Sequence, residues 1–211
     1  MTREQAYALH NPFRIGNGSE HSVFCRSQKA DSSLLLGRQS VRLVFPNQEW
    51  IDLVAESPQI TSLFVDRPRA RDLSPLSSLR LFNFSVSYPS YVKNWSFLSS
   101  FSSLVRLVLA NTLSILDLEP LREFLNLEVL MVSGGYSKTL KLPSLSPLSD
   151  LIRLKVIALA AVRFECWDLD CLLKLPELCL FDCPQYWPKD EVMKLARSKP
   201  QLISNAIELE T

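Results

Sequence analysis

The sequence predicts an α/β fold: a right-handed, curved solenoid with parallel β-strands on its concave face and short helices or 3₁₀ turns on its convex face. Three observations predict it. Apolar residues recur in the pattern Leu-x-x-Leu-x-Leu at intervals of 19 to 27 residues. Each copy ends in the period-2 alternation of a strand with one buried face. Several copies are preceded by Leu-x-Pro-Leu, whose proline suits the first turn of a helix.

The repeats can be followed along the chain, with Ile, Val or Phe replacing some of the leucines. The six copies are Ile60/Leu63/Val65, Leu79/Phe82/Phe84, Leu104/Leu107/Leu109, Leu127/Leu130/Val132, Leu154/Ile157/Leu159 and Leu175/Leu178/Leu180. Degenerate copies at 41–45 and 202–207 flank them. One unit cannot bury its own leucines, so the units must stack with their strands about 4.8 Å apart. This predicts about seven or eight strands around a continuous apolar ladder.

The two ends of such a stack need caps, because an open stack exposes core and strand edges. Residues 1–39 lack the repeat and are interpreted as an N-terminal capping segment that begins with a short helix after Thr2. Residues 40–211 are interpreted as the solenoid with its C-terminal capping helix and strand. The capping helix is expected at 188–198, with acids in its first turn and bases in its last. A similar helix is expected at 47–57, and Glu208 and Glu210 protect the terminal strand.

Length and composition limit the class of protein. The 211 residues suit one domain, and a net charge of +1 argues against a dedicated nucleic-acid binder. No apolar stretch is long enough to span a membrane, and the amino terminus lacks the apolar core of a secretory signal. The five cysteines are odd in number and scattered, which favours reduced thiols and a cytoplasmic location.

Residues 58–183 resemble the leucine-rich repeat proteins, and the segment 72–79 (Asp-Leu-Ser-Pro-Leu-Ser-Ser-Leu) is similar to the repeats of bacterial internalin-type proteins. The resemblance implies a leucine-rich repeat solenoid. The chain departs from the family pattern at the position after each strand where Asn or Cys is expected. Only Cys183 matches that position, and the other copies have Ser87, Thr112, Gly135 or Val162 there.

The sequence predicts no catalytic residue, no metal site and no cofactor. The two histidines both lie in the predicted N-terminal cap, and the four C-terminal cysteines lack the paired spacing of a zinc site. An enzyme remains a remote alternative, in which Cys179 on the concave face would be the reactive side chain and Glu177 beside it the base. The loop 66–72 carries three arginines and two aspartates. A phosphate contact is possible there, but a solvated charged loop is favoured.

A binding surface is expected on two neighbouring parts of the solenoid. Strand residues that alternate with the leucines face outward on the concave side, where apolar residues predict an interaction site. The loops at the carboxyl ends of the strands carry Tyr and Trp, which are common in protein–protein hot spots. Trp95 and Trp187 are instead expected in the core. The predicted partner-binding residues are Phe64, Asp66, Asn83, Tyr88, Tyr91, Arg106, Val108, Met131, Tyr136, Trp167 and Phe181.

The function predicted from the sequence is that of a non-enzymatic protein-binding module with one folded protein partner. A stoichiometric inhibitor or immunity protein that neutralises a toxin or enzyme is the specific hypothesis. An adaptor or scaffold that recruits a substrate protein is the alternative. The chain is expected to be a monomer, or a heterodimer with its partner, without binding nucleic acid or membranes.

Overall fold

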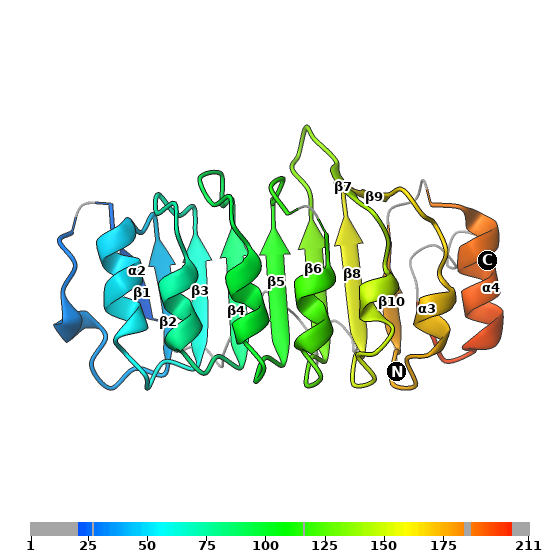
Figure 1. Ribbon diagram of the computed structural model, residues 1–211, viewed down its shortest axis with the longest axis horizontal. Coiled ribbons are helices and arrows are strands. Elements are labelled where there is room, and N and C mark those ends of the chain that lie inside the picture. The colour runs from blue at the N-terminus through cyan, green and yellow to red at the C-terminus, as the bar shows by residue number, and fades with distance from the viewer. Residues whose placement is uncertain (1–20, 27, 116, 184–186, 204–211) are drawn as a thin grey trace.

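The computed structural model describes residues 21–26, 28–115, 117–183 and 187–203. Eight parallel strands form one sheet whose spatial order follows the chain (Figure 1). They are β1 (His21–Phe24), β2 (Ser40–Val44), β3 (Ser62–Asp66), β4 (Asn83–Ser87), β5 (Arg106–Ala110), β6 (Val129–Ser133), β8 (Val156–Ala160) and β10 (Leu180–Asp182). This arrangement confirms the predicted solenoid and its number of strands.

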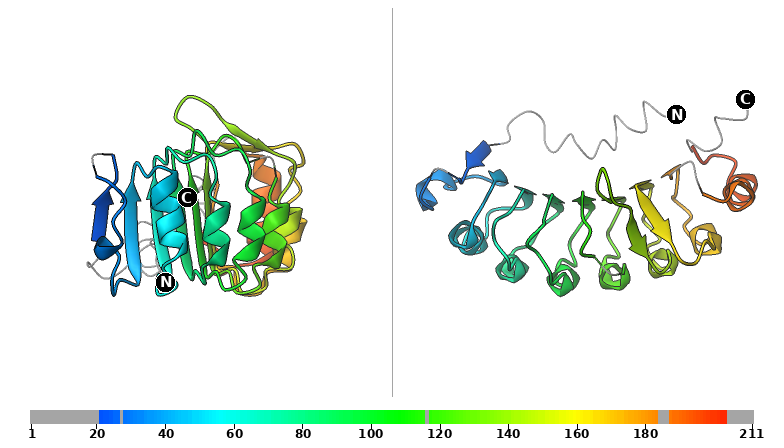
Figure 2. Two further views of the ribbon diagram at one scale, coloured as in Figure 1. Left: turned by 60° about the vertical axis from the view of Figure 1, so that its left-hand side comes forward. Right: turned by 90° about the horizontal axis from the view of Figure 1, so that it is seen from above.

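Short helices cover one side of the sheet, and seen from above the sheet lies on the inner side of an arc with the helices outside (Figure 2). They are η1 (Ser32–Leu34), α2 (Gln48–Ala55), η2 (Ser74–Ser78), η3 (Ser96–Ser100), η4 (Glu119–Glu123), η5 (Ser146–Leu148), α3 (Asp170–Leu173) and α4 (Lys189–Ser198). The helices expected at 47–57 and 188–198 are therefore confirmed as α2 and α4. Strands β7 (Leu140–Leu142) and β9 (Val162–Phe164) form a separate parallel pair.

The predicted caps are described only in part. Strand β1 lies within the segment 1–39 and pairs with β2, so the sheet extends into the region expected to be a cap. The helix expected after Thr2 lies outside the described residues, as do Glu208 and Glu210. Among the described residues, no helix has both the length and the apolar character that crossing a bilayer requires.

The core is built from a register-matched row of inward side chains. The strand pairing aligns one residue from each repeat, in the order Leu63, Phe84, Leu107, Leu130, Ile157 and Phe181. Each of these side chains is at most 1% exposed. Burial of one such side chain stabilises a fold by roughly 1.5–3 kcal/mol, so the row is the main source of cohesion between repeats.

Two of the six predicted motif copies are out of register. In the second copy the structure places Leu81, Phe84 and Val86 inward instead of Leu79, Phe82 and Phe84, and Phe82 is 38% exposed. Leu79 is buried as well, but it ends η2 and precedes the strand. Because Leu79 and Leu81 are both apolar, two alignments of the motif fit the sequence equally well.

The last copy shows the same error. Leu178, Phe181 and Cys183 occupy the three inward positions, whereas Leu180 lies on the opposite face beside Val156. Cys183 is therefore the third apolar residue of its repeat and not the polar residue after the strand. The predicted outward position of Phe181 is wrong, because its side chain is fully buried in the core.

The convex helices begin with a recurring turn that the sequence analysis did not identify. A side-chain oxygen accepts a hydrogen bond from the backbone N–H two residues later, at 2.7–3.3 Å. Such turns hold the chain in the geometry that starts a helical turn. The acceptors are Asp72, Asn94, Asp117, Ser144 and Asp168, and each precedes one of the helices η2, η3, η4, η5 and α3.

Candidate binding surface

The outward side chains of the sheet form rows across the concave face. The central row consists of Arg42, Phe64, Ser85, Val108, Met131, Ala158 and Asp182, which the strand register aligns. Three of these belong to the predicted binding residues, namely Phe64, Val108 and Met131. Phe64 and Met131 are half-buried, whereas Val108 is only 4% exposed. The row is apolar at Val108, Met131 and Ala158 but carries Arg42, Ser85 and Asp182 as well, so the apolar stripe expected from the sequence is interrupted and less exposed than predicted.

A hollow of about 310 Å³ lies in the middle of this face, between β5, β6 and β8. Val108 and Met131 contribute to its wall, and Asp182 also lines it. The hollow exists because several outward positions here carry alanine, whose small side chain leaves space above the strands. These residues are Ala110, Ala158 and Ala160. Their importance was not visible in the sequence, because it depends on which strands are neighbours.

The N-terminal side of the concave face is polar and held in place by internal contacts. The Arg42 guanidinium lies 4.4 Å from the centroid of the Phe64 ring, and one of its nitrogens is 3.9 Å from the Asp66 carboxylate. The Ser87 hydroxyl donates a hydrogen bond to the same carboxylate at 2.6 Å. Asp66 therefore already has partners within the chain. Asp66 thereby helps to hold Arg42 beside Phe64, and its role in partner binding stays a prediction.

A chain of alternating charges runs along the amino ends of the C-terminal strands. Lys155 Nζ is 3.0 Å from the Glu128 carboxylate and 3.6 Å from that of Glu177. The hydrogen bond from Lys155 to Glu128 raises the pKa of Lys155. The predicted binding residue Arg106 is half-buried nearby, and burial lowers the pKa of its guanidinium against the opposing effect of Glu128. Asn83 is half-buried in the same row as Arg106.

The geometry around Cys179 does not support the enzymatic alternative. The thiol donates a hydrogen bond to the Lys155 carbonyl at 3.3 Å, and burial raises its pKa. A nucleophilic cysteine requires the opposite shift, toward the thiolate. Glu177 forms an ion pair with Lys155. All five cysteines are free in the structure.

The aromatic residues in the loops at the carboxyl ends of the strands fall into two groups, one exposed and one half-buried or buried. Tyr136 is 95% exposed and Tyr91 is 55% exposed, so both are available for contact. Trp167 is half-buried, and its ring lies 5.3 Å from that of Trp187 in an edge-to-face arrangement. Trp95 and Trp187 are buried, which confirms their predicted place in the core.

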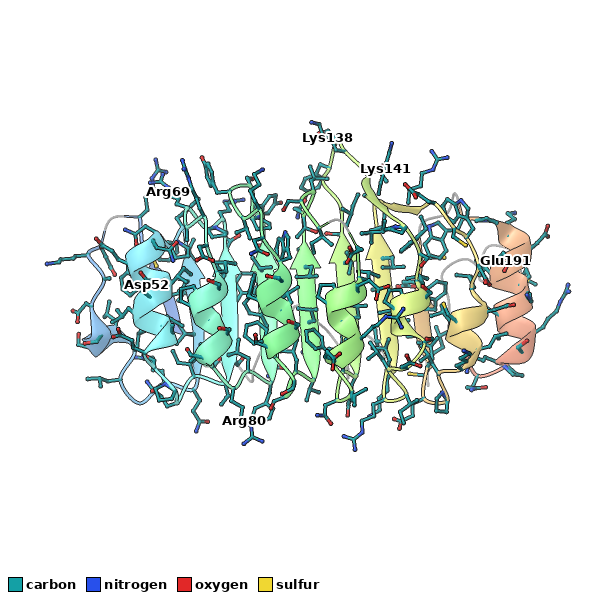
Figure 3. All side chains as sticks on the ribbon, viewed as in Figure 1. Asp52, Arg69, Arg80, Lys138, Lys141 and Glu191 are labelled. Atoms are coloured by element: carbon teal, nitrogen blue, oxygen red, sulfur yellow. The ribbon has the colours of Figure 1, made fainter. Side chains whose placement is uncertain are left out.

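Tyr136, whose side chain is the most exposed of the aromatic residues that the structure describes, lies on a tight loop between β6 and β7. A Cβ atom on Gly134 would collide with the Ala161 carbonyl oxygen, so no other residue fits there without a backbone shift. The Gly135 N–H donates to the Lys138 carbonyl at 2.9 Å and closes the turn. Tyr136 and Lys138 thereby project from the carboxyl edge of the sheet, where Lys138 is seen at the top of Figure 3.

A row of arginine and aromatic side chains runs along the same edge. Phe45, Arg67 and Tyr88 each follow the last residue of their strand and adopt left-handed backbone conformations, with φ of 57°, 49° and 50°. The Arg67 guanidinium lies 5.7 Å from the Phe45 ring centroid and 4.9 Å from that of Tyr88. The Arg26 guanidinium also lies against Phe45, 5.9 Å from its ring centroid. We call Arg26, Phe45, Arg67 and Tyr88 the Arg–aromatic row.

The row continues toward the exposed loop of β6. A hydrogen bond with Tyr136 raises the pKa of Tyr88, against the lowering effect of Arg67. Two of the predicted binding residues, Tyr88 and Tyr136, are thus brought together. No pattern in the sequence marks Arg67 and Phe45 as a stacked pair, because their stacking depends on the left-handed turn after each strand.

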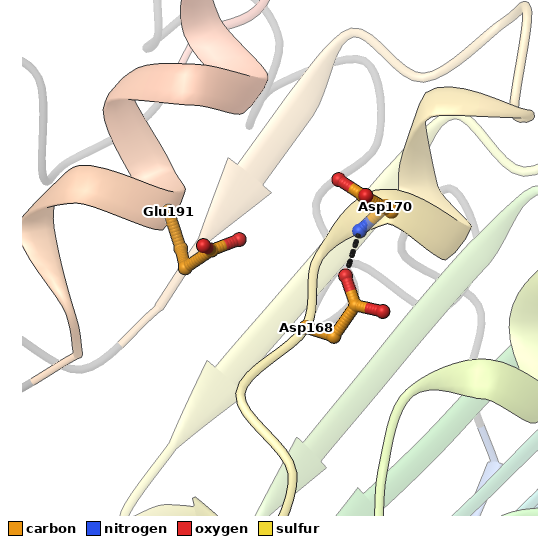
Figure 4. A group of neighbouring side chains, drawn as sticks. All are labelled: Asp168, Asp170 and Glu191. Carbon is orange, nitrogen blue, oxygen red and sulfur yellow. Dashed lines mark hydrogen bonds between the residues drawn. The ribbon is translucent and has the colours of Figure 1, made fainter.

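One group of acidic side chains has a spacing that could suit a metal ion. Asp168, Asp170 and Glu191 approach one another between α3 and α4, within 4.8 Å (Figure 4). Asp168 accepts a hydrogen bond from the Asp170 N–H at 2.7 Å, and Lys194 Nζ is 2.6 Å from the Asp170 carboxylate. These contacts account for two of the three carboxylates, Asp168 in the turn that precedes α3 and Asp170 in an ion pair.

Comparison with known proteins defines the fold. No protein-family model matches the sequence. No curated protein matches it either. Among solved structures, the chain is similar to an internalin (inlF) of Listeria monocytogenes, with a TM-score of 0.63 and 16% identity. It is also similar to an internalin C2 (inlC2) of that organism, with a TM-score of 0.58 and 24% identity.

The fold is an internalin-like leucine-rich repeat solenoid. The match to inlF covers 86% of this chain and 51% of the inlF chain, so this chain spans about half of its length. The match to inlC2 covers 82% of this chain and 72% of that chain. The resemblance to internalin-type repeats seen in the sequence is therefore confirmed at the level of fold.

Proposed function

We propose that this protein is a non-enzymatic protein-binding module that holds one folded protein against its concave face and the adjoining carboxyl-edge loops. The observation that carries the proposal is the hollow of about 310 Å³ between β5, β6 and β8. A hollow of this size, walled by Val108, Ala110 and Met131, can receive one large apolar side chain of a partner. Anchor residues buried in such pockets dominate the affinity of protein–protein interfaces.

The exposed aromatic residues support the same proposal. Tyr136 and Tyr91 project from the loops that follow β6 and β4, which lie on either side of β5 in the sheet. Tyrosine provides a large contact area at a small cost in side-chain entropy. A partner seated on the concave face would meet these side chains at the rim of its contact area.

The specific role that we propose is stoichiometric inhibition, as in an immunity protein that occludes a toxin or enzyme. The described residues form repeats and a C-terminal helix, so we expect the protein to act by binding its partner. An adaptor or scaffold is the alternative, and an assay of the partner's own activity in the complex distinguishes the two. Five free thiols suit a reducing compartment, which supports a cytoplasmic site of action.

The test is co-purification of a tagged chain from its source cells, with two matched variants. Met131→Arg places a charged side chain in the hollow, and Ser77→Arg places the same side chain on η2 of the convex face, where Ser77 is exposed. We expect one protein to co-purify in equimolar amount with the wild type and with Ser77→Arg, but not with Met131→Arg.

Circular dichroism and urea unfolding provide the control for folding of both variants. Undiminished capture by folded Met131→Arg would contradict the proposal. Equal loss in both variants would do the same, because it would show that the hollow has no special role.

A further inference from the structure

The carboxyl-edge loops carry an excess of cationic side chains. The loops 25–31, 45–47, 67–72, 88–94, 111–117, 134–144 and 161–168 contain nine Lys or Arg residues and five Asp or Glu residues. Four of those acids (Asp31, Asp72, Asp117 and Asp168) accept hydrogen bonds from backbone N–H groups. Within the described ranges, no ion pair joins any of the nine cations to a carboxylate. The nine are Arg26, Lys29, Arg67, Arg69, Arg71, Lys93, Lys138, Lys141 and Arg163.

The Arg–aromatic row holds two of these cations in fixed positions. Arg67 lies between the Phe45 and Tyr88 rings, and Arg26 lies against Phe45. A guanidinium that stacks on a ring still presents its N–H groups at its edge, and these match the two oxygens of a carboxylate. The row therefore orders its cations, and the exposed Arg67 keeps N–H donors besides the one in its hydrogen bond with Tyr88.

The small sheet at the same edge places two cations side by side. The register of β7 and β9 pairs Lys141 with Arg163, and both side chains are exposed. Their strand neighbours Leu140, Leu142 and Val162 are buried, so the pairing cannot slip without exposing apolar residues. Like charges directly opposite each other destabilise a strand pair. Binding of an anionic group would relieve this repulsion.

The amino edge of the sheet differs from the carboxyl edge in this respect. Lys155 is paired with two glutamates, and an Arg153 nitrogen donates to the Asn126 side-chain oxygen at 3.0 Å. Arg80 Nε donates to the Ser103 hydroxyl at 3.3 Å, although Arg80 also lies over an aromatic ring, 5.6 Å from the Phe82 centroid. Figure 3 shows Arg80 at the edge opposite to Arg69, Lys138 and Lys141.

We propose that the carboxyl edge binds an acidic, carboxylate-rich surface of the partner protein, through the Arg–aromatic row and the Lys141–Arg163 pair. This inference rests on the proposed function and names the chemistry of its partner. Complementary charge at the rim accelerates association and selects among partners, while the apolar hollow supplies the anchor. The proposal gives Arg67 a role in binding, whereas the sequence favoured a solvated charged loop at 66–72.

The test measures binding of a fluorescein-labelled Glu-rich peptide to the purified chain by fluorescence anisotropy. A Lys-rich peptide of equal length and a single-stranded DNA oligonucleotide of equal charge serve as comparison probes. We expect the Glu-rich peptide to bind, with an affinity that falls as NaCl is added. We expect Arg67→Ala and Lys141→Ala each to weaken this binding by about twofold to fivefold. Arg80→Ala is the matched control, because it removes a stacked arginine from the opposite edge.

Three results would overturn the inference. The first is absence of Glu-rich peptide binding at low salt, and the second is an equal loss of affinity in Arg80→Ala. The third is tighter binding of the DNA oligonucleotide than of the peptide, which would identify a nucleic-acid surface instead. Two separate readouts distinguish the inference from the proposed function. Undiminished partner capture by folded Met131→Arg counts against the proposed function, whereas absence of Glu-rich peptide binding by the wild-type chain counts against the inference.

Discussion

The two faces of the same eight strands show how this chain divides stability from recognition. On the face that points into the core, Leu63, Phe84 and Leu107 are at most 1% exposed and form one apolar row. On the concave face, Phe64 and Met131 are half-buried, and a hollow lies between β5, β6 and β8. Leu63 and Phe64 are adjacent in sequence, yet one supports the core and the other faces outward. Because side chains alternate along each strand, residues on the concave face can vary without loss of the fold.

The largest effect on stability should follow from truncating a side chain of the core-facing row. Phe84 packs against Phe97 and Phe101, with ring centroids 6.3 and 5.3 Å apart. We expect Phe84→Ala to lower the free energy of unfolding by about 3–5 kcal/mol, because it leaves a cavity between two repeats. Met131→Ala on the concave face should lower the free energy of unfolding by less than about 1 kcal/mol. Urea unfolding measures both, and equal costs would contradict the division between the two faces.

A smaller effect tests the loop that presents Tyr136. Gly134→Ala should cost about 1–3 kcal/mol, because the added methyl group would collide with the Ala161 carbonyl oxygen. Gly135→Ala is the control, since its Cβ would meet no atom closer than 3.6 Å. Thermal unfolding compares the two. A stable Gly134→Ala would show that the backbone here adapts, and that the loop does not fix the position of Tyr136.

The recurring turns before the convex helices should have a moderate effect. Asp117 accepts a hydrogen bond from the Glu119 N–H at 3.0 Å. We expect Asp117→Ala to cost about 1 kcal/mol, a magnitude typical of lost helix caps. Asp117→Asn keeps an acceptor oxygen and should recover most of that loss. If urea unfolding shows that both variants lose the same stability, the charge and not the hydrogen bond is responsible.

The smallest effect has the opposite sign. Lys141→Gln should raise the free energy of unfolding by about 0.2–1 kcal/mol, because it removes the repulsion from Arg163. The gain should shrink as salt is added, since salt screens exposed charges. Lys138→Gln in the preceding turn lacks such a cross-strand neighbour and should change stability less. A loss of stability in Lys141→Gln would show that the pair is not repulsive.

Much of this architecture could be predicted from the sequence, because strand alternation and repeat spacing are local properties. The solenoid, α2, α4 and the buried Trp95 and Trp187 all followed from such patterns. The register of two repeats could not, because Leu79 with Leu81, and Leu175 with Leu178, offer two apolar alignments. Only pairing with the neighbouring strand selects one of them, and that choice moved Phe181 from the predicted surface into the core.

The candidate surface was harder to predict than the fold. The hollow depends on Ala110 and Ala158 lying near each other on different strands, and alanine gives no signal of its own in the sequence. The Arg–aromatic row depends on left-handed backbone at Phe45, Arg67 and Tyr88, where a non-glycine residue is uncommon. Both features arise from contacts between repeats about 20 residues apart, which a pattern within one repeat does not contain.

The most direct measurement of the central claim is site-specific photocrosslinking on the two faces. A photoreactive amino acid replaces Met131 in one variant and Ser77 of the convex face in another, and both are irradiated in the source cells. Binding across the concave face predicts one covalent adduct of defined mass from position 131 and none from position 77. Equal adducts from both positions, or an adduct from position 77 alone, would contradict the claim.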